Sequence, residues 1–62
     1  MRNEIICKRI AVRALSTRMD RIEFISETFN ERNEQVIRVK HNGFPYEIKE
    51  KNGVLLSVSR VI

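Results

Sequence analysis

The stretch of sequence that decides the fold is residues 39–56, VKHNGFPYEIKEKNGVLL, in which the dipeptide Asn-Gly occurs twice. Asn42-Gly43 and Asn52-Gly53 each stand between segments in which apolar and polar residues alternate. Both residue types tolerate the positive φ that a two-residue hairpin turn requires, so this dipeptide is a strong hairpin signal. The sequence therefore predicts two successive hairpins, which together make a three-stranded antiparallel meander.

The first turn predicts a register for the first two strands. With Asn42-Gly43 as a two-residue turn, Val39 faces Tyr46 and Ile37 faces Ile48, so the large apolar residues lie on one side. His41 opposite Phe44 belongs to the same side. The pairs predicted on the other side are Arg38–Glu47 and Lys40–Pro45.

The second turn is predicted to be longer than the first. A three-residue loop, residues 51–53 with Gly53 in the left-handed conformation, pairs Ile48 with Leu56 and keeps a single apolar face. That predicted face comprises Ile37, Val39, Phe44, Tyr46, Ile48, Val54, Leu56 and Val58. Pro45 is unfavourable in a central strand because it has no N–H, so we expect the third strand to stop short of it or a bulge to accommodate it.

Two earlier segments are expected to cover the apolar face. Residues 17–33, TRMDRIEFISETFNERN, place apolar residues at helical spacing after a capping box of Thr17 and Asp20, which predicts a helix. Residues 4–15, EIICKRIAVRAL, are ambiguous, because their Ala, Arg and Leu favour helix whereas their Ile and Val favour strand. We favour helix for them; the alternative is a fourth strand, with the order β-α-β-β-β.

The predicted fold class is therefore α+β, with N-terminal helical segments packed on one face of a three-stranded antiparallel meander. Residues 1–62 are expected to form a single small domain. Composition agrees with a folded chain, since 42% of the residues are hydrophobic and 32% are charged. No apolar run approaches the ~20 residues that span a bilayer. We find no secretory signal, and a single cysteine cannot form an internal disulfide, so a cytoplasmic location is expected.

The residue inventory argues against an enzyme. The chain has one His, one Cys and one Asp, and no nucleophile stands with a base at a recognisable spacing. His41 is expected at the rim of the sheet with solvent as its partner, and Cys7 is expected to be a small buried apolar residue. Both glycines belong to turns, so there is no phosphate-binding loop. We expect no cofactor, no metal, no small-molecule substrate and no membrane association.

The charge pattern favours nucleic-acid binding. Two basic blocks, residues 1–21 and 35–62, flank an acidic one, residues 22–34, and the net charge is +4. An antiparallel sheet face or ribbon can contact phosphates or enter the major groove, which favours DNA over RNA only weakly. The first hypothesis is thus a small non-enzymatic nucleic-acid-binding regulatory protein. Its candidate contacts are Arg38, Lys40, Lys49 and Lys51 of the sheet, with Arg9 and Arg13 of the N-terminal block. A solvated face with an Arg38–Glu47 ion pair is the simpler interpretation.

Two alternatives come from other classes of protein. On a helix over residues 17–33, acidic residues form a ridge beside an aromatic side chain, which predicts a protein-binding regulator such as an inhibitor or adaptor. The candidate residues for a protein partner are Glu23, Phe24, Glu27 and Glu31. A third hypothesis is a homodimeric or larger assembly subunit that uses Val36, Leu55 and Val61 of the outer sheet face, helped by an open edge on the last strand.

Overall fold

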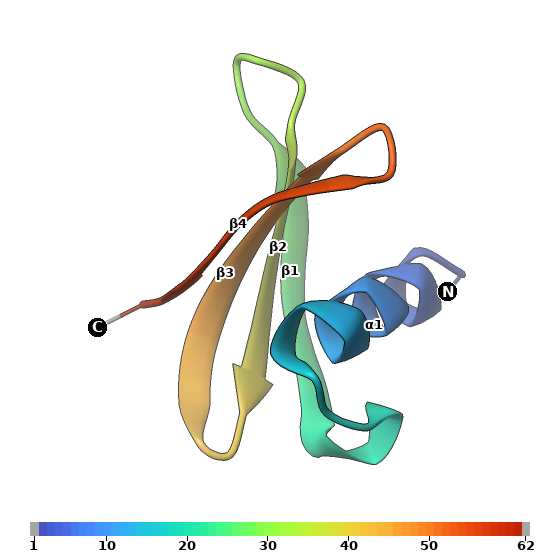
Figure 1. Ribbon diagram of the computed structural model, residues 1–62, viewed down its shortest axis with the longest axis vertical. Helices are drawn as coiled ribbons and strands as arrows, with labels where there is room; N and C mark the ends of the chain where they lie inside the picture. Colours follow the sequence, from blue (N-terminus) through green and yellow to red (C-terminus); the bar gives the residue numbers. More distant parts are fainter. Residues whose placement is uncertain (1, 62) are drawn as a thin grey trace.

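The computed structural model describes residues 2–61, which form an α-helix, a turn of 3-10 helix and a four-stranded antiparallel sheet (Figure 1). In chain order the elements are α1 (Arg2–Leu15), the 3-10 turn η1 (Met19–Arg21), β1 (Ile22–Phe29), β2 (Gln35–His41), β3 (Phe44–Lys51) and β4 (Val54–Arg60). The strands lie in the order β1-β2-β3-β4, so each pairs with its neighbour in the sequence. The α+β class and the antiparallel meander are confirmed, with one strand more than the three predicted.

No helix within residues 2–61 has both the length and the apolar character needed to cross a bilayer.

The N-terminal segment is helical, as favoured for residues 4–15. Cys7 and Ala11, one turn apart, are fully buried against the sheet. The helix ends where Ser16 adopts a positive φ of 53° and the Thr17 N–H donates to the Val12 carbonyl at 3.1 Å. This is the 6→1 bond of a Schellman motif, in which Ser16 occupies the position that glycine usually takes.

The helix predicted over residues 17–33 is wrong, because its central part, Ile22–Phe29, forms strand β1. Phe24 pairs with Val39 and Ser26 with Arg38, so Ile25 is the extra residue of a β-bulge. The bulge interrupts the two-residue alternation and leaves Ile22, Ile25 and Phe29 at intervals of three and four, which imitates a helical stripe. The order β-α-β-β-β is also wrong, since the fourth strand comes from this segment and not from residues 4–15. The predicted capping box of Thr17 and Asp20 is absent too. Arg18, and not Thr17, is the N-cap residue of η1, and its side chain makes no capping hydrogen bond.

Asn30 organises the loop between β1 and β2. Its side-chain oxygen accepts hydrogen bonds from the backbone N–H groups of Arg32 and Glu34, at 3.0 and 2.9 Å. Its amide nitrogen donates to the carboxylate of Glu34 at 2.8 Å. Asn33 supplies a positive φ of 61°. The residues that ended the predicted helix therefore form a tight loop instead, because Asn side chains satisfy local backbone groups.

The first hairpin has the predicted register. Ile37 pairs with Ile48, and Val39 pairs with Tyr46. The turn residues have the positive φ values that a two-residue turn needs, 53° at Asn42 and 82° at Gly43. The remaining predicted pairs are also present: His41–Phe44, Lys40–Pro45 and Arg38–Glu47.

Pro45 is accommodated without a bulge. The residues next to a two-residue turn form a hydrogen-bonded pair, so the following pair, Lys40–Pro45, is of the type that exchanges no hydrogen bonds. The first hairpin therefore does not require an N–H from Pro45. On its other side, the Pro45 carbonyl accepts a hydrogen bond from the Val61 N–H at 2.9 Å. The expectation that the third predicted strand, now β4, stops short of Pro45 is confirmed, because its ladder with β3 ends at the pair Tyr46–Arg60.

The second hairpin has a two-residue turn, and the predicted three-residue loop is wrong. Lys51 pairs with Val54 directly across Asn52-Gly53, where φ is 52° and 80°. The extra residue enters the strand instead, because Leu56 bulges between the pairs Glu50–Leu55 and Lys49–Ser57. Ile48 consequently faces Val58 rather than Leu56. Val54 and Leu55 therefore lie on the sides opposite to those predicted. Leu55 lies on the same side of the sheet as Glu50, and Val54 lies on the same side as Lys51.

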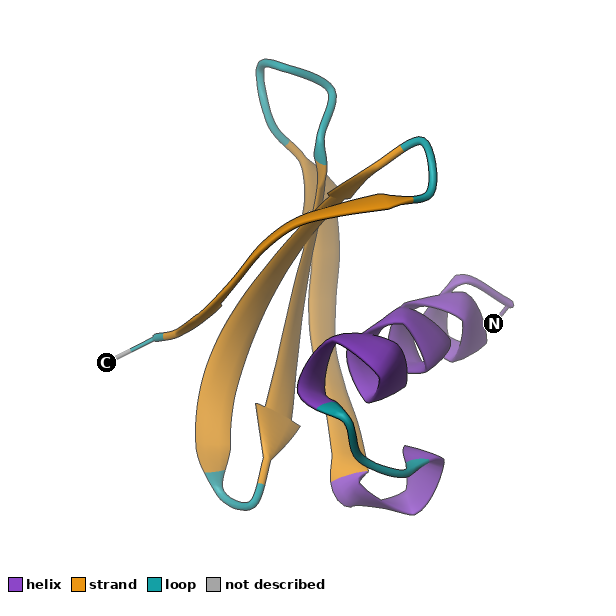
Figure 2. Cartoon of the chain, viewed as in Figure 1, coloured by secondary structure: helices purple, strands orange, loops and turns teal. Residues whose placement is uncertain are grey.

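Helix α1 covers one face of the sheet, called the inner face below, and the opposite side is the outer face. The helix packs mainly over β1 and β2 (Figures 1 and 2). The second turn and the loop after β1 lie toward one end of the sheet, and the first turn lies at the other (Figure 2). The core comprises Cys7, Ala11, Ile22, Ile37, Val39 and Ile48. Every residue of β4 is exposed.

Candidate nucleic-acid interface

The outer face of the sheet carries four of the six cations expected to contact nucleic acid. Arg38 and Lys40 alternate along β2 with the buried residues Ile37 and Val39, so they project away from the helix. Lys49 and Lys51 occupy the equivalent positions on β3, across the sheet from Val36 and Val54. Arg38, Lys40 and Lys51 are exposed, and Lys49 is half-buried. The sheet register alone therefore gathers these four cations on one side.

Two carboxylates share the outer face with the cations. Glu47 lies opposite Arg38, and their Oε2 and Nη2 atoms are 3.7 Å apart. Glu23 on β1 pairs with Lys40 across the sheet. Among the strand residues, four cations against two carboxylates leave 4 − 2 = +2, and Glu31, Arg32 and Glu34 of the adjoining loop lie beside Lys49. The Arg38–Glu47 ion pair that a simple solvated face would contain is thus present, but it neutralises only part of the positive charge on the outer face.

Hydroxyl side chains complete the outer face. Ser26 and Thr28 of β1 lie opposite Arg38 and Val36. Ser57 and Ser59 of β4 lie opposite Lys49 and Glu47. Hydroxyl groups donate hydrogen bonds to phosphate oxygens as readily as they bind water. Ser26 and Thr28 were missed in the sequence because their segment was interpreted as helix. The alternation of Ile22, Glu23 and Phe24 is the signal that pointed to a strand.

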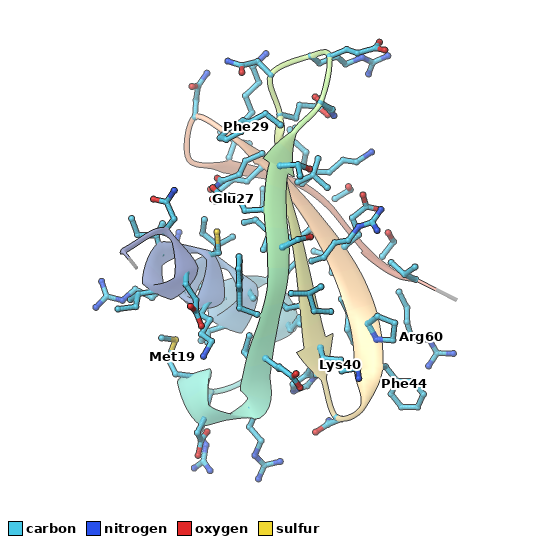
Figure 3. All side chains as sticks on the ribbon, turned by 180° about the vertical axis from the view of Figure 1, so that it is seen from behind. Met19, Glu27, Phe29, Lys40, Phe44 and Arg60 are labelled. Atoms are coloured by element: carbon cyan, nitrogen blue, oxygen red, sulfur yellow. The ribbon has the colours of Figure 1, made fainter. Side chains whose placement is uncertain are left out.

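Lys51 also anchors the loop between β1 and β2. Its ammonium group donates to the Arg32 carbonyl at 3.0 Å. Lys49 lies beside the same loop, in a polar hollow with Phe29, Asn30 and Glu34. Two of the four sheet cations therefore stand at one end of the outer face, and Lys40 stands at the other, near the first turn (Figure 3).

Arg9 and Arg13 lie on the other side of the molecule. Both are exposed on α1, whereas Cys7 and Ala11 form the helix surface that contacts the inner face. The two arginines line an open groove together with Ile6, Ile10 and Met19. Because the sheet separates them from the outer face, a single flat surface cannot contact both basic groups. Tertiary structure thus divides the predicted set of six cations into four and two.

The residues of the acidic alternative are not gathered on one surface. Glu23 lies on the outer face, and Glu27, paired with Ile37, lies on the inner face. Phe24 is half-buried and packs against the core, so it is not an exposed anchor. Glu31 belongs to the loop after β1. The predicted ridge depended on a helix, and strand geometry disperses it.

A polar cluster lies beneath α1 that the sequence did not reveal. The Gln35 amide donates to the Glu27 carboxylate and approaches the Cys7 sulfur at 3.8 Å. Glu50 is also buried nearby, at 9% exposure. Burial, and then the negative charges of Glu27 and Glu50, raise the pKa of the Cys7 thiol to about 11. The buried position predicted for Cys7 is confirmed, although part of its surroundings is polar.

His41 has a protein partner rather than solvent alone. Its Nε2 lies 2.8 Å from the Thr17 hydroxyl, and its ring is tilted against that of Tyr46 at a centroid distance of 6.2 Å. The imidazole thus ties the end of β2 to the connection after α1. Within residues 2–61, no group of three or more His, Cys, Asp or Glu side chains is arranged to hold a metal ion.

Comparisons of the chain with protein-family models, with curated proteins and with solved structures found no match.

Proposed function

We propose that this protein is a small, non-enzymatic nucleic-acid-binding regulator that contacts the phosphate backbone with the outer face of its sheet. One observation carries the proposal: Arg38, Lys40, Lys49 and Lys51 stand among serine and threonine hydroxyls on a face that α1 leaves uncovered. Cations that release counterions supply most of the non-specific affinity for nucleic acid, and hydroxyl groups add directional hydrogen bonds.

The same face supports duplex DNA as the preferred form of nucleic acid. Phe44 and Tyr46 belong to the inner face by their pairing with His41 and Val39. The outer face is therefore built from charged and hydroxyl side chains with the aliphatic Val36 and Val54, and not from the aromatic platforms on which single-stranded bases stack. Strands can follow the backbone or enter the major groove of B-DNA, whereas the major groove of RNA is too narrow for side chains to read.

The proposed role requires no cofactor, small-molecule substrate or membrane. We place it in the cytoplasm, where a free thiol such as Cys7 stays reduced. Arg9 and Arg13 are assigned a secondary part, because they lie on the side opposite the four sheet cations.

A salt titration with two charge-matched variants tests the proposal. Binding to a short duplex DNA is measured by fluorescence anisotropy for the wild type, for Lys49→Gln/Lys51→Gln and for Arg9→Gln/Arg13→Gln. Both double variants lose two positive charges, but from opposite sides of the sheet. The slope of log K against log salt is negative, and we expect the lysine double variant to reduce its magnitude by about 1.8 units, which is about 0.9 for each lost phosphate contact. The arginine pair should change it by much less.

Two outcomes would contradict the proposal. Equal loss in both variants would mean that net charge, and not the outer face, controls binding. Absence of salt-dependent binding by the wild type at micromolar concentration and low ionic strength would rule out the function itself. A parallel titration with duplex RNA of the same sequence tests the preference for DNA.

A further inference from the structure

The outer edge of strand β4 carries backbone groups with no partner. The Val61 N–H donates to Pro45 on β3. In an antiparallel pair, the residues that bond to one neighbour alternate with residues that point the other way. Ser59 and Ser57 therefore direct their backbone groups toward β3, whereas Val58 and Arg60 direct theirs outward. Within residues 2–61, no strand pairs with that side of β4.

This edge has only part of the usual protection against strand pairing, namely a bulge at Leu56 and one charge, Arg60, at the end of the strand. Natural edge strands carry charges, prolines or bulges along their length. Residues 54–59, VLLSVS, contain neither a charge nor a proline, and the bulge at Leu56 leaves Ser57–Arg60 regular. Strand β1 at the opposite edge has both kinds of protection, with Glu23 and Glu27 in the strand and a bulge at its centre.

Apolar side chains beside this edge are also uncovered. Leu55 and Val58 point to the inner face and are 47% and 37% exposed. Leu56 at the bulge is 46% exposed. At the end of the strand, the Arg60 guanidinium stacks on the Phe44 ring at 4.6 Å (Figure 3). A partner that pairs with β4 would thus extend the sheet and cover leucine and valine side chains together.

We propose that the occupant of this edge is a second copy of the chain, paired antiparallel through β4 with Val58 opposite the partner's Val58. An antiparallel pair of identical strands has two-fold symmetry, so the edge is complementary to itself. Residues 54–59 offer no charge with which to select a foreign partner, and Arg60 at the end of β4 is the one charge of the strand. The inference does not rest on the proposed function.

The alternation of side chains and backbone groups favours this register. Val58 directs its backbone groups outward, so two copies of it form a hydrogen-bonded pair. Ser57 then faces the partner's Ser59 on the outer face, and Arg60 faces the partner's Leu56. The two Arg60 side chains are four strand positions apart, about 13 Å, which exceeds the screening length of ~8 Å at physiological salt. Moving the register so that Ser59 faces the partner's Ser59 would bring them within about 7 Å.

In the dimer, the two inner faces would lie side by side on one side of the joined sheet, and the two outer faces on the other. The two-fold axis of an antiparallel edge pair is perpendicular to the sheet, so both helices lie on one side of an eight-stranded sheet. Leu55 and Val58 of both copies then line the centre of the inner face. The outer faces join into one surface with two-fold symmetry.

Opposed charge variants at the two serines test the register as well as the dimer. In the full-length chain, Ser57→Lys/Ser59→Lys places like charges across the two-fold axis, whereas Ser57→Lys/Ser59→Glu places opposite charges there. Neither substitution changes a buried residue, since both serines are exposed on the outer face. Sedimentation equilibrium should give two chains for the wild type and for the Lys/Glu variant. The Lys/Lys variant should raise the dimer dissociation constant at least about tenfold, because like charges directly opposite destabilise a strand pair.

Circular dichroism of each variant separates loss of the dimer from loss of the fold. A wild-type protein that remains a single chain at about 1 mM, where even a weak complex forms, would overturn the proposal, and so would a single chain that binds an extended foreign peptide at β4. Equal dissociation of the two variants would overturn the Val58 register. Assemblies larger than two chains would overturn the closed two-fold pairing.

Discussion

The side-chain amide of Gln35 on β2 donates a hydrogen bond to the carboxylate of Glu27 on β1, directly beneath the buried thiol of Cys7. This contact joins two strands on the face that α1 covers. It makes Glu27 a structural residue, although the sequence alone suggested an exposed carboxylate on a helix. Half-buried polar groups such as these stabilise a fold when they are paired and destabilise it when one partner is removed.

Removal of the Glu27 carboxylate should therefore destabilise the protein. We expect Glu27→Ala to lower the free energy of unfolding by about 1–3 kcal/mol, because the half-buried Gln35 amide loses its acceptor. Glu27→Gln keeps a carbonyl oxygen in the same place and should cost less. Urea denaturation of both variants measures the difference. Equal losses would show that the hydrogen bond contributes nothing measurable.

The thiol of Cys7 should couple stability to alkaline pH. Its pKa rises from an ordinary 9.0 to about 11 on folding, through burial first and then the charges of Glu27 and Glu50. The protonated thiol is thus favoured in the folded state, and its contribution is complete below pH 9.0 and lost as the pH rises toward 11. Between those values, the wild type should lose stability more steeply than Cys7→Ala. Parallel pH profiles of the two proteins would contradict this expectation.

The turn glycines should tolerate asparagine better than valine. Gly43 and Gly53 have φ values of 82° and 80°, and a Cβ at either position would meet no atom within 4 Å. The cost of substitution is therefore backbone strain and not a clash. We expect Gly53→Val to lower the free energy of unfolding by more than about 1 kcal/mol, and Gly53→Asn to cost less, since Asn adopts positive φ more readily. Thermal unfolding compares the pair, and equal costs would argue against this turn geometry.

The hydrogen bond between His41 and Thr17 should help to hold the connection after α1 against the sheet. Thr17→Val keeps the size and branching of the side chain but removes the oxygen that lies 2.8 Å from Nε2. We expect a loss of about 0.5–1.5 kcal/mol in the free energy of unfolding, whereas Thr17→Ser should retain most of the stability. Chemical denaturation distinguishes the two variants. If Thr17→Ser lowers the free energy of unfolding as much as Thr17→Val does, the hydroxyl contact with His41 does not contribute to stability.

Two isoleucines on neighbouring strands test the bulge in β1. Ile37 is fully buried in the core, and Ile25 is 48% exposed at the bulge. Truncation of a buried isoleucine to alanine typically costs about 2–5 kcal/mol, which is enough to unfold a chain of this size. We expect Ile37→Ala to be largely unfolded and Ile25→Ala to cost less than about 1 kcal/mol. Circular dichroism checks both, and a large loss at Ile25 would mean that it belongs to the core.

The sequence by itself determined the first hairpin, because the information needed for it is local. Asn42-Gly43 specifies the turn, and a register in error by one residue would expose Ile37, Val39 and Ile48 together. The same alternation correctly placed Arg38, Lys40 and Lys49 on a shared face. The helical N-terminal segment was also predictable, since its Ala, Arg and Leu outweigh its Ile and Val.

Tertiary structure decided everything that a bulge affects. Ile25 and Leu56 are each an extra residue opposite a regular partner strand, and a bulge becomes defined only when that strand is in place. Without the partner, the spacing of Ile22, Ile25 and Phe29 looks helical. The division of the cations has the same origin: Arg9 and Arg13 were assigned with Arg38 by charge alone, but α1 packs on the face opposite Arg38. Local sequence specifies turns and alternation, whereas the side of the sheet that a helix covers depends on contacts between residues far apart in the chain.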